Sequence, residues 1–168
     1  MSAANGAPFS LEAQDAALLR TGSLSIMAAS RGPGSIPSMA RALGIRLSAD
    51  FHRITLFFPS SRAQEFLDDI ASNGVIAAVF CVPGTHESLQ LKGTGARVEK
   101  IAAGDAALVS SCCDSFVDDV EKLGYRRDLI RQLVPCESQD LVAVTFTPSA
   151  AFSQTPGPSA GHAIGVTA

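Results

Sequence analysis

The segment over residues 37–74 constrains the fold more than any other part of the chain. The residue pattern predicts a strand over residues 38–48, and a short turn joins it to a second strand over residues 53–58. Residues 61–72 then carry apolar side chains at helical spacing. Strands joined by so short a turn run antiparallel, so the segment disfavours a doubly wound parallel sheet.

The same signals place the other elements around this segment. Six strands, with one helix after the third and a helical pair before the last, predict a mainly β fold with α (α+β), a small barrel capped by helices. No G-x-G-x-x-G motif follows a strand, which also disfavours a Rossmann fold. Gly93 and Gly95 predict a bulge or a close backbone approach in the fifth strand. The other expected strands are residues 24–29, 75–82, 87–101 and 140–147, and the other expected helices are residues 11–19, 105–123 and 126–134.

Composition limits the classes of function. A length of 168 residues with 46% apolar residues predicts one domain over residues 1–168, with disordered tails at residues 1–10 and 162–168. The net charge of −3 provides no basic surface for nucleic acid. The longest apolar run, residues 75–82, is too short to span a membrane, and the cysteines form no CxxC pair. We therefore expect a reduced, cytoplasmic protein that binds neither nucleic acid nor a membrane.

Hydroxyls and arginines gather where the second strand of the segment meets its helix. Ser60, Ser61 and Arg62 begin the helix, where unpaired N–H groups and a partial positive charge favour a phosphate. Arg41 or Arg46 from the preceding strand would add a second guanidinium. A pocket of this kind beside a flat apolar wall suits a mononucleotide such as FMN. Helix capping by the serines, including a capping box that starts at Ser61, and ion pairing of the arginines explain the same residues without a ligand.

Arg41 is the less ordinary of the two strand arginines. Alternation places it on one face with Met39, Leu43, Ile45 and Leu47. A buried charge without a partner is costly, so Arg41 needs an anionic group beside it. The opposite face carries small residues, against which either a flat ligand or a packed helix could lie.

Few side chains elsewhere suit catalysis. Four polar residues point the same way on the fifth strand and either face solvent or line a site: His86, Ser88, Gln90 and Lys92. No nucleophile and no second His or Cys at metal-ligand spacing accompanies His86, so we expect no metal site. The Cys112-Cys113 pair lies on a helix that faces the core, which predicts buried packing.

Three motifs in residues 37–93, together with the tail at residues 152–158, carry a family resemblance. They are the arginines Arg41 and Arg46 on one strand, Phe58 followed by Ser61-Arg62 at a helix start, and a polar strand over residues 88–93 that ends in glycine. In this order and spacing the chain resembles the pyridoxamine 5′-phosphate oxidase-like family of FMN-binding split β-barrels.

The resemblance implies a homodimer with FMN at the subunit interface. Arg41, Arg62 and Ser61 would contact the phosphate or the ribityl chain, and the backbone of residues 42–45 would run along the flavin ring. The residues that the resemblance implies at the FMN site are Arg41, Ala42, Leu43, Gly44, Ile45, Arg46, Phe58, Ser60, Ser61, Arg62, Ser88 and Gln90. Arg46 and His86 are the candidates for groups that face a substrate.

We therefore expect an FMN-dependent oxidoreductase acting on an unidentified small molecule. The chain departs from the pyridoxamine 5′-phosphate oxidase itself, because Ala63 replaces the family's usual second cation and the sequence contains no tryptophan. One alternative is a non-catalytic carrier for FMN, a deazaflavin or haem on the same fold. The other is an empty barrel that serves as a dimeric scaffold, in which Arg41 is ion paired, for example with Asp50 or Glu87.

Overall fold

The computed structural model describes Phe9, Leu11 and residues 13–164. In this part of the chain, eight strands form one antiparallel sheet and four α-helices flank it. The strands are β1 (Ser25–Arg31), β2 (Pro37–Ala42), β3 (Gly44–Leu47), β4 (Ile54–Pro59), β5 (Ile76–Cys81), β6 (Ser88–Glu99), β7 (Leu141–Ser153) and β8 (Ala163–Ile164). The helices are α1 (Ala13–Leu19), α2 (Ser60–Asn73), α3 (Asp105–Lys122) and α4 (Arg127–Leu133), with one-turn 3-10 helices at Pro33–Ser35 and Ser138–Asp140. None of these helices is long and apolar enough to cross a membrane.

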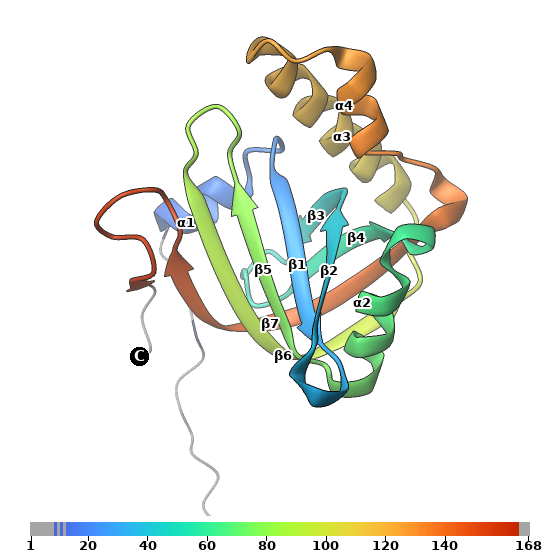
Figure 1. Ribbon diagram of the computed structural model, residues 1–168, viewed down its shortest axis with the longest axis vertical. Helices are drawn as coiled ribbons and strands as arrows, with labels where there is room; N and C mark the ends of the chain where they lie inside the picture. Colours follow the sequence, from blue (N-terminus) through green and yellow to red (C-terminus); the bar gives the residue numbers. More distant parts are fainter. Residues whose placement is uncertain (1–8, 10, 12, 165–168) are drawn as a thin grey trace, which may run out of the picture.

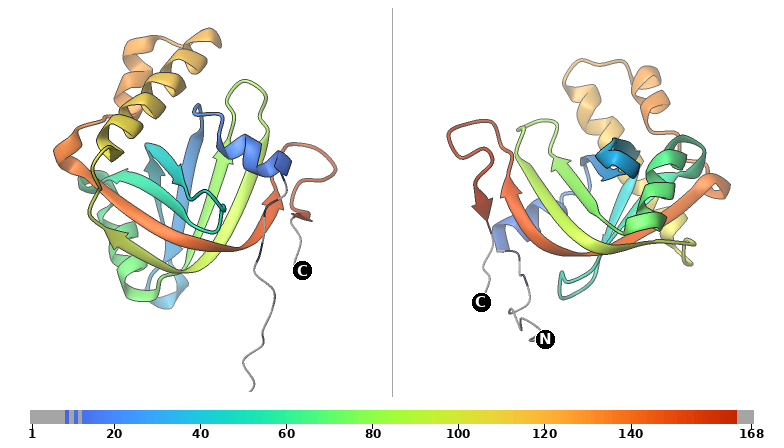
Figure 2. Two further views of the ribbon diagram at one scale, coloured as in Figure 1. Left: turned by 180° about the vertical axis from the view of Figure 1, so that it is seen from behind. Right: turned by 60° about the horizontal axis from the view of Figure 1, so that its bottom comes forward.

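A single residue joins the two edges of the sheet. The strand order is β2-β1-β5-β6-β7-β4-β3, with β8 on β7, so β2 and β3 lie at opposite ends. Only Leu43 separates them in the chain, and its N–H donates to the carbonyl of Phe57 at 2.7 Å. A sheet whose end strands are consecutive in the chain must curl until its edges approach. Figure 1 and Figure 2 show the resulting half-barrel.

The strand expected over residues 38–48 is therefore two strands. Leu43, Gly44 and Ile45 are buried in succession, which breaks the alternation of buried and exposed residues. The cause is a change of partner, because β2 pairs with β1 whereas β3 pairs with β4. The α+β class predicted from the sequence is confirmed, with eight strands among the described residues where six were expected.

A bulge bends the long β6–β7 pair. The register shifts between Lys92 and Gly93 and again between Thr94 and Arg97, as the glycines of this strand predict. A Cβ added at Gly93 would lie 2.6 Å from the carbonyl oxygen of Thr147. The close approach of the two strands therefore requires glycine at this position.

Two apolar clusters attach the helices to the sheet. The first lies between α2 and the sheet, and the α2 side chains in it are Ala63, Phe66, Leu67 and Ile70. The second joins α3 and α4 to the region of β3, through Leu43, Phe57, Val109, Cys113, Phe116, Val117 and Ile130. Full burial of a large apolar side chain contributes about 1.5–3 kcal/mol, so these clusters dominate the stability of the fold.

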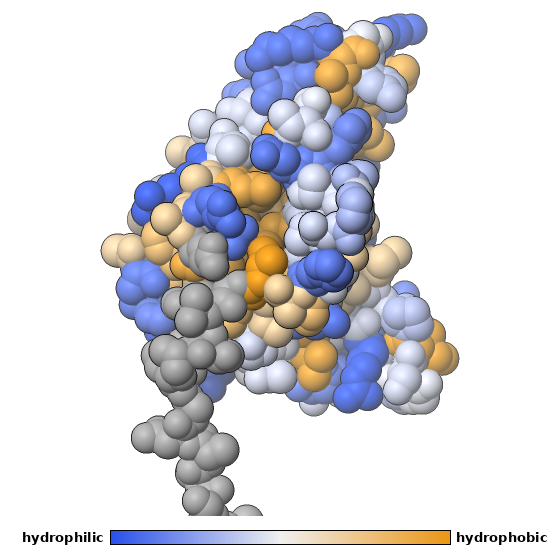
Figure 3. All heavy atoms as spheres, turned by 90° about the vertical axis from the view of Figure 1, so that its left-hand side faces the viewer, coloured by the Kyte–Doolittle hydropathy of each residue, from blue (hydrophilic) through white to orange (hydrophobic). Residues whose placement is uncertain are grey.

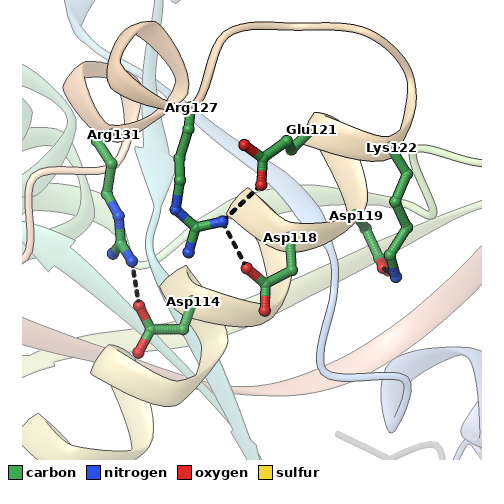
Figure 4. A network of polar contacts seen from close by, with 7 residues as sticks. All are labelled: Asp114, Asp118, Asp119, Glu121, Lys122, Arg127 and Arg131. Carbon is green, nitrogen blue, oxygen red and sulfur yellow. Dashed lines mark hydrogen bonds and ion pairs between the residues drawn. The ribbon is translucent and has the colours of Figure 1, made fainter.

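The helices α3 and α4 form a hairpin that projects from the barrel (Figure 1). Ion pairs connect them, as Figure 4 shows: Arg127 lies 2.8 Å from the carboxylates of Asp118 and Glu121, and Arg131 lies 2.6 Å from that of Asp114. On the side seen in Figure 3, the hairpin at the top carries mainly hydrophilic side chains. Exposed ion pairs contribute about 0.2–1 kcal/mol each to stability. Burial of apolar side chains in the second cluster therefore contributes more of the free energy that holds the hairpin on the barrel.

Near its C-terminus the chain has more regular structure than the sequence predicts, whereas the first helix, expected from residue 11, begins at Ala13. β7 continues to Ser153, beyond the expected end of the last strand at residue 147. Ala163–Ile164 pair with it as β8, within residues 162–168 where a disordered tail was expected. Phe9, in the other expected tail, packs against the first apolar cluster. The rest of both tails, residues 1–8, 10 and 165–168, lies outside the described residues.

Candidate functional site

A cavity of about 270 Å³ lies where β1 and β2 meet the first turn of α2 and the end of α4. Two arginines belong to its wall, Arg41 from β2 and Arg62 from α2. Most of the remaining wall is apolar and consists of Met27, Met39, Leu43, Pro59, Leu133 and Pro135. The two arginines that the sequence suggested for one phosphate therefore line the same small, mainly apolar cavity.

Both arginines have neutral hydrogen-bond partners. The Nη1–H of Arg41 donates to the hydroxyl of Ser25 at 3.0 Å, and the Nη1–H of Arg62 donates to the carbonyl of Gln132 at 3.3 Å. Among the residues that the structure describes, neither arginine lies within 4.0 Å of a carboxylate. Arg41 is half-buried, on the outward face of β2. Two guanidinium groups with neutral partners can together bind an anionic group of a ligand.

The N-terminus of α2 already holds a carboxylate from within the chain. Ser60 Oγ donates to Asp140 Oδ1 at 2.6 Å, the N–H of Ser61 donates to the same oxygen at 2.9 Å, and Ser61 Oγ donates to Oδ2 at 2.5 Å. The capping box expected at Ser61 is wrong, because the N-cap is Pro59 and Asp140 takes the serine hydroxyls. The pKa of Asp140 is lowered, and the largest cause is the hydrogen bond from Ser60. The hydrogen bonds from Ser61 and the nearby charge of Arg62 lower it further.

Arg46 lies outside this cavity. Its guanidinium is ion paired with the buried carboxylate of Asp105 and lies 5.7 Å from the centre of the Phe57 ring. Asp105 also accepts the N–H of Ala102 at 2.7 Å. The change of strand at Leu43 explains the separation, because it moves Arg46 from the edge that carries Arg41 to the opposite edge of the sheet.

Protein covers most of the backbone of residues 42–45, along which the flavin ring was expected to run. Ala42 and Ile45 belong to the first apolar cluster, and so does Phe58, which has no exposed surface. A Cβ added at Gly44 would lie 3.4 Å from Cβ and Sγ of Cys112, so α3 packs directly on this backbone. Of the two alternatives for the face of small residues, a flat ligand or a packed helix, the packed helix is the one found at Gly44. Of residues 42–45 only Leu43 reaches the cavity.

The candidates on β6 also lie apart from the arginine cavity. The N–H of Ser88 donates to Thr155 Oγ1 at 2.9 Å, and Gln154 donates to the side-chain oxygen of Gln90 at 3.3 Å. His86 is exposed in the turn before β6, with a φ of +61°. Because β6 is three strands from β2 in the sheet, one chain does not bring these residues to Arg41.

The two cysteines of α3 are buried or half-buried. The described residues contain no group of three or more His, Cys, Asp or Glu that could hold a metal ion. Cys113 is buried and donates to the carbonyl of Leu43 at 3.6 Å, and burial raises the pKa of its thiol to about 12. Burial also raises the pKa of Cys112. Thiols of this kind are unreactive near neutral pH, in line with the expected packing role.

Comparison with known proteins identifies the fold. No protein-family model and no curated protein matches the sequence. Among solved structures, HupZ from Group A Streptococcus superposes with a TM-score of 0.52 at 16% identity, covering 90% of this chain and 100% of that chain. A Lactobacillus delbrueckii protein described as a candidate pyridoxamine 5′-phosphate oxidase gives a TM-score of 0.52 at 12% identity, covering 84% of this chain and 93% of that chain.

A third structure carries the same family description. It is a Clostridium acetobutylicum protein related to general stress protein 26 of Bacillus subtilis, of the pyridoxinephosphate oxidase family. Its TM-score is 0.50 at 14% identity, and the match covers 92% of both chains. At such identities the likeness establishes the fold alone. The resemblance predicted from the sequence is confirmed at that level: the chain has the split-barrel fold of pyridoxamine 5′-phosphate oxidase-related proteins.

Proposed function

We propose that this protein binds FMN, with the phosphate held by Arg41 and Arg62, and that it is an FMN-dependent oxidoreductase acting on a small molecule. One observation carries the proposal: two guanidinium groups without a carboxylate partner among the described residues line one mainly apolar cavity. The scaffold alternative required an ion-paired Arg41, whereas Arg41 donates to the neutral hydroxyl of Ser25.

The chemistry of the wall fits a flavin mononucleotide. Arg41 and Arg62 would hold the phosphate, and Met27 and Leu43 would contact an apolar part of the ligand. Bound FMN would supply hydride or electron transfer, while the protein provides position and electrostatics. A cavity of about 270 Å³ is small for a whole ligand of this size, so part of FMN would extend over the adjoining surface.

The exposed rim of the cavity supports a homodimer that completes the site. Met39 is 68% exposed and Leu133 is 55% exposed, and both belong to the cavity wall. Exposed apolar side chains at the mouth of a cavity are typical of an interaction surface. A second copy packed on this rim would cover the part of FMN that one chain leaves open. Arg46 and His86 would act on a substrate only if the dimer brings them to the flavin.

The second candidate is a carrier that binds FMN, a deazaflavin or haem without turnover. This candidate is favoured because Arg46 and His86, the groups expected to face a substrate, do not belong to the wall of the arginine cavity. Haem also requires an axial ligand, and His86 lies in an exposed turn.

Titration of the purified protein with FMN tests the proposal. Riboflavin, which lacks the phosphate, is the matched ligand control, and Arg97→Gln on β6 is the matched protein control. We expect Arg41→Gln with Arg62→Gln to weaken FMN binding at least about tenfold, while Arg97→Gln leaves it unchanged. Equal binding of FMN and riboflavin, or binding that survives the double substitution, contradicts the assignment. Reduction of the bound flavin by a nicotinamide donor, compared with dithionite, separates an oxidoreductase from a carrier.

A further inference from the structure

Asp140 places a negative charge near Arg62, one of the two arginines of the cavity. It ends the 3-10 helix Ser138–Asp140, directly before β7, and its carboxylate accepts three hydrogen bonds from Ser60 and Ser61. The residues that flank these serines in the chain, Pro59 and Arg62, both line the cavity. The donors that Asp140 occupies therefore lie at the border of the space where a ligand's anionic group would bind.

The charge of Asp140 opposes a phosphate in this space. Its carboxylate partly offsets the positive charge of Arg62. A phosphate monoester carries about −1.5 to −2 charges near neutral pH, so it would meet a like charge as well as two guanidinium groups. The two hydroxyls and the N–H that suit a phosphate at a helix N-terminus are already bonded to the carboxylate.

We infer that Asp140 is a built-in competitor for the anionic group of the ligand. It holds the donors of Ser60 and Ser61 when the cavity is empty, and a phosphate must bind against its charge or displace it. Asp140 thus limits the affinity of the cavity for phosphate-bearing ligands. The inference rests on the proposed function, because it concerns the same cavity, and it assigns a specificity-determining role to a residue 78 positions from Arg62 in the chain.

A plain capping role is the competing explanation. A carboxylate at a helix N-terminus stabilises the helix whether or not a ligand exists. The two roles differ in one measurable respect, because a cap alone predicts that neutralising Asp140 leaves phosphate affinity unchanged.

The test compares three forms of the full chain: the wild type, Asp140→Asn and Asp68→Asn. The asparagine at position 140 keeps an oxygen that can accept the N–H of Ser61, so the helix start retains a cap. Asp68, on the exposed side of the same helix, is bonded to Gln64 and serves as the control for a lost negative charge. Asp140→Ser, which also keeps an acceptor, replaces Asp140→Asn if circular dichroism shows that the latter does not fold.

Calorimetric titration with FMN gives the first readout. We expect Asp140→Asn to bind FMN about tenfold more tightly than the wild type, and Asp68→Asn to remain within about twofold. Equal or weaker binding by Asp140→Asn overturns the inference, even if both proteins bind FMN.

Inorganic phosphate gives a second readout that does not depend on FMN. Phosphate should raise the melting temperature of Asp140→Asn more than that of the wild type, and adding Arg62→Gln should remove the difference. If neither protein binds FMN but this difference appears, the FMN proposal fails and the role of Asp140 stands. If phosphate affects both proteins equally, Asp140 is a helix cap only and the inference is wrong.

Discussion

Replacing Arg46 with alanine should destabilise the fold, because its partner is buried. The side chain of Asp105 is 4% exposed, whereas that of Arg46 is 42% exposed. Removing one partner of a fully buried ion pair costs about 3–5 kcal/mol, and hydrogen bonds to charged groups contribute about 1.5–3 kcal/mol. Water can reach the Arg46 side, and Asp105 keeps its hydrogen bond from Ala102. We therefore expect Arg46→Ala to lower the free energy of unfolding by roughly 2 kcal/mol.

Urea unfolding followed by circular dichroism measures this loss. For a chain of this size, roughly 2 kcal/mol corresponds to a fall of about 4–8 °C in the melting temperature. Arg127→Ala is the matched control, because it removes an arginine whose ion pairs are exposed, and it should cost less than about 1 kcal/mol.

A second substitution separates the buried charge from other effects. Adding Asp105→Asn to Arg46→Ala removes the unpaired charge but keeps an acceptor for the N–H of Ala102, so part of the stability should return. If Arg46→Ala costs no more than Arg127→Ala, or if the double variant recovers nothing, the ion pair does not stabilise the fold. Arg46 would then be available for the role expected from the sequence, as a group that faces a substrate.

Three further predictions follow from single features. Gly93→Ala should lower the free energy of unfolding by roughly 1–3 kcal/mol or more, because a Cβ would lie 2.6 Å from the Thr147 carbonyl oxygen. Urea unfolding measures this loss, and an unchanged free energy of unfolding would contradict the bulge geometry. The folded pKa of Asp140 lies below its ordinary value of 3.8, so its contribution to stability is present above that value and is lost as the pH falls through the folded pKa. The stability difference between wild type and Asp140→Asn should therefore shrink as the pH falls below 3.8, and a constant difference would refute the assignment. Cys113 should resist maleimide at pH 8 until the protein unfolds, because burial raises the pKa of its thiol to about 12. Mass spectrometry measures the labelling, and rapid labelling of the folded protein would contradict the burial of Cys113.

The sequence was sufficient for the fold class because most elements have local signals. The apolar spacing of residues 61–72 predicted α2 to within about a residue. Gly93 and Gly95 predicted the bulge of β6, because glycine inside a strand is a local signal of irregular backbone. The change of partner at Leu43 has no such signal, because its residue types suit a continuous strand equally well.

Long-range partners account for what the sequence could not predict at the site. Arg41 and Arg62 were named from the sequence as candidates for one phosphate, and both line one cavity. Asp140 was missed because 78 residues separate it from Arg62 and only the β4–β7 pairing, Pro59 opposite Leu141, brings it to the helix. Asp140 is a single aspartate before a strand, and the neighbouring sequence gives no local reason to connect it with α2.

The single-residue link at Leu43 fixes the length of the chain at the seam of the barrel. Side chains alternate along a strand, so one residue inserted here would turn either Arg41 toward the core or Arg46 away from Asp105. The turn between β5 and β6 has no such constraint, since it lies on the surface and connects strands that are neighbours in the sheet. Natural variants of this chain should therefore differ in length at residues 83–87 and keep the spacing between Arg41 and Arg46 constant.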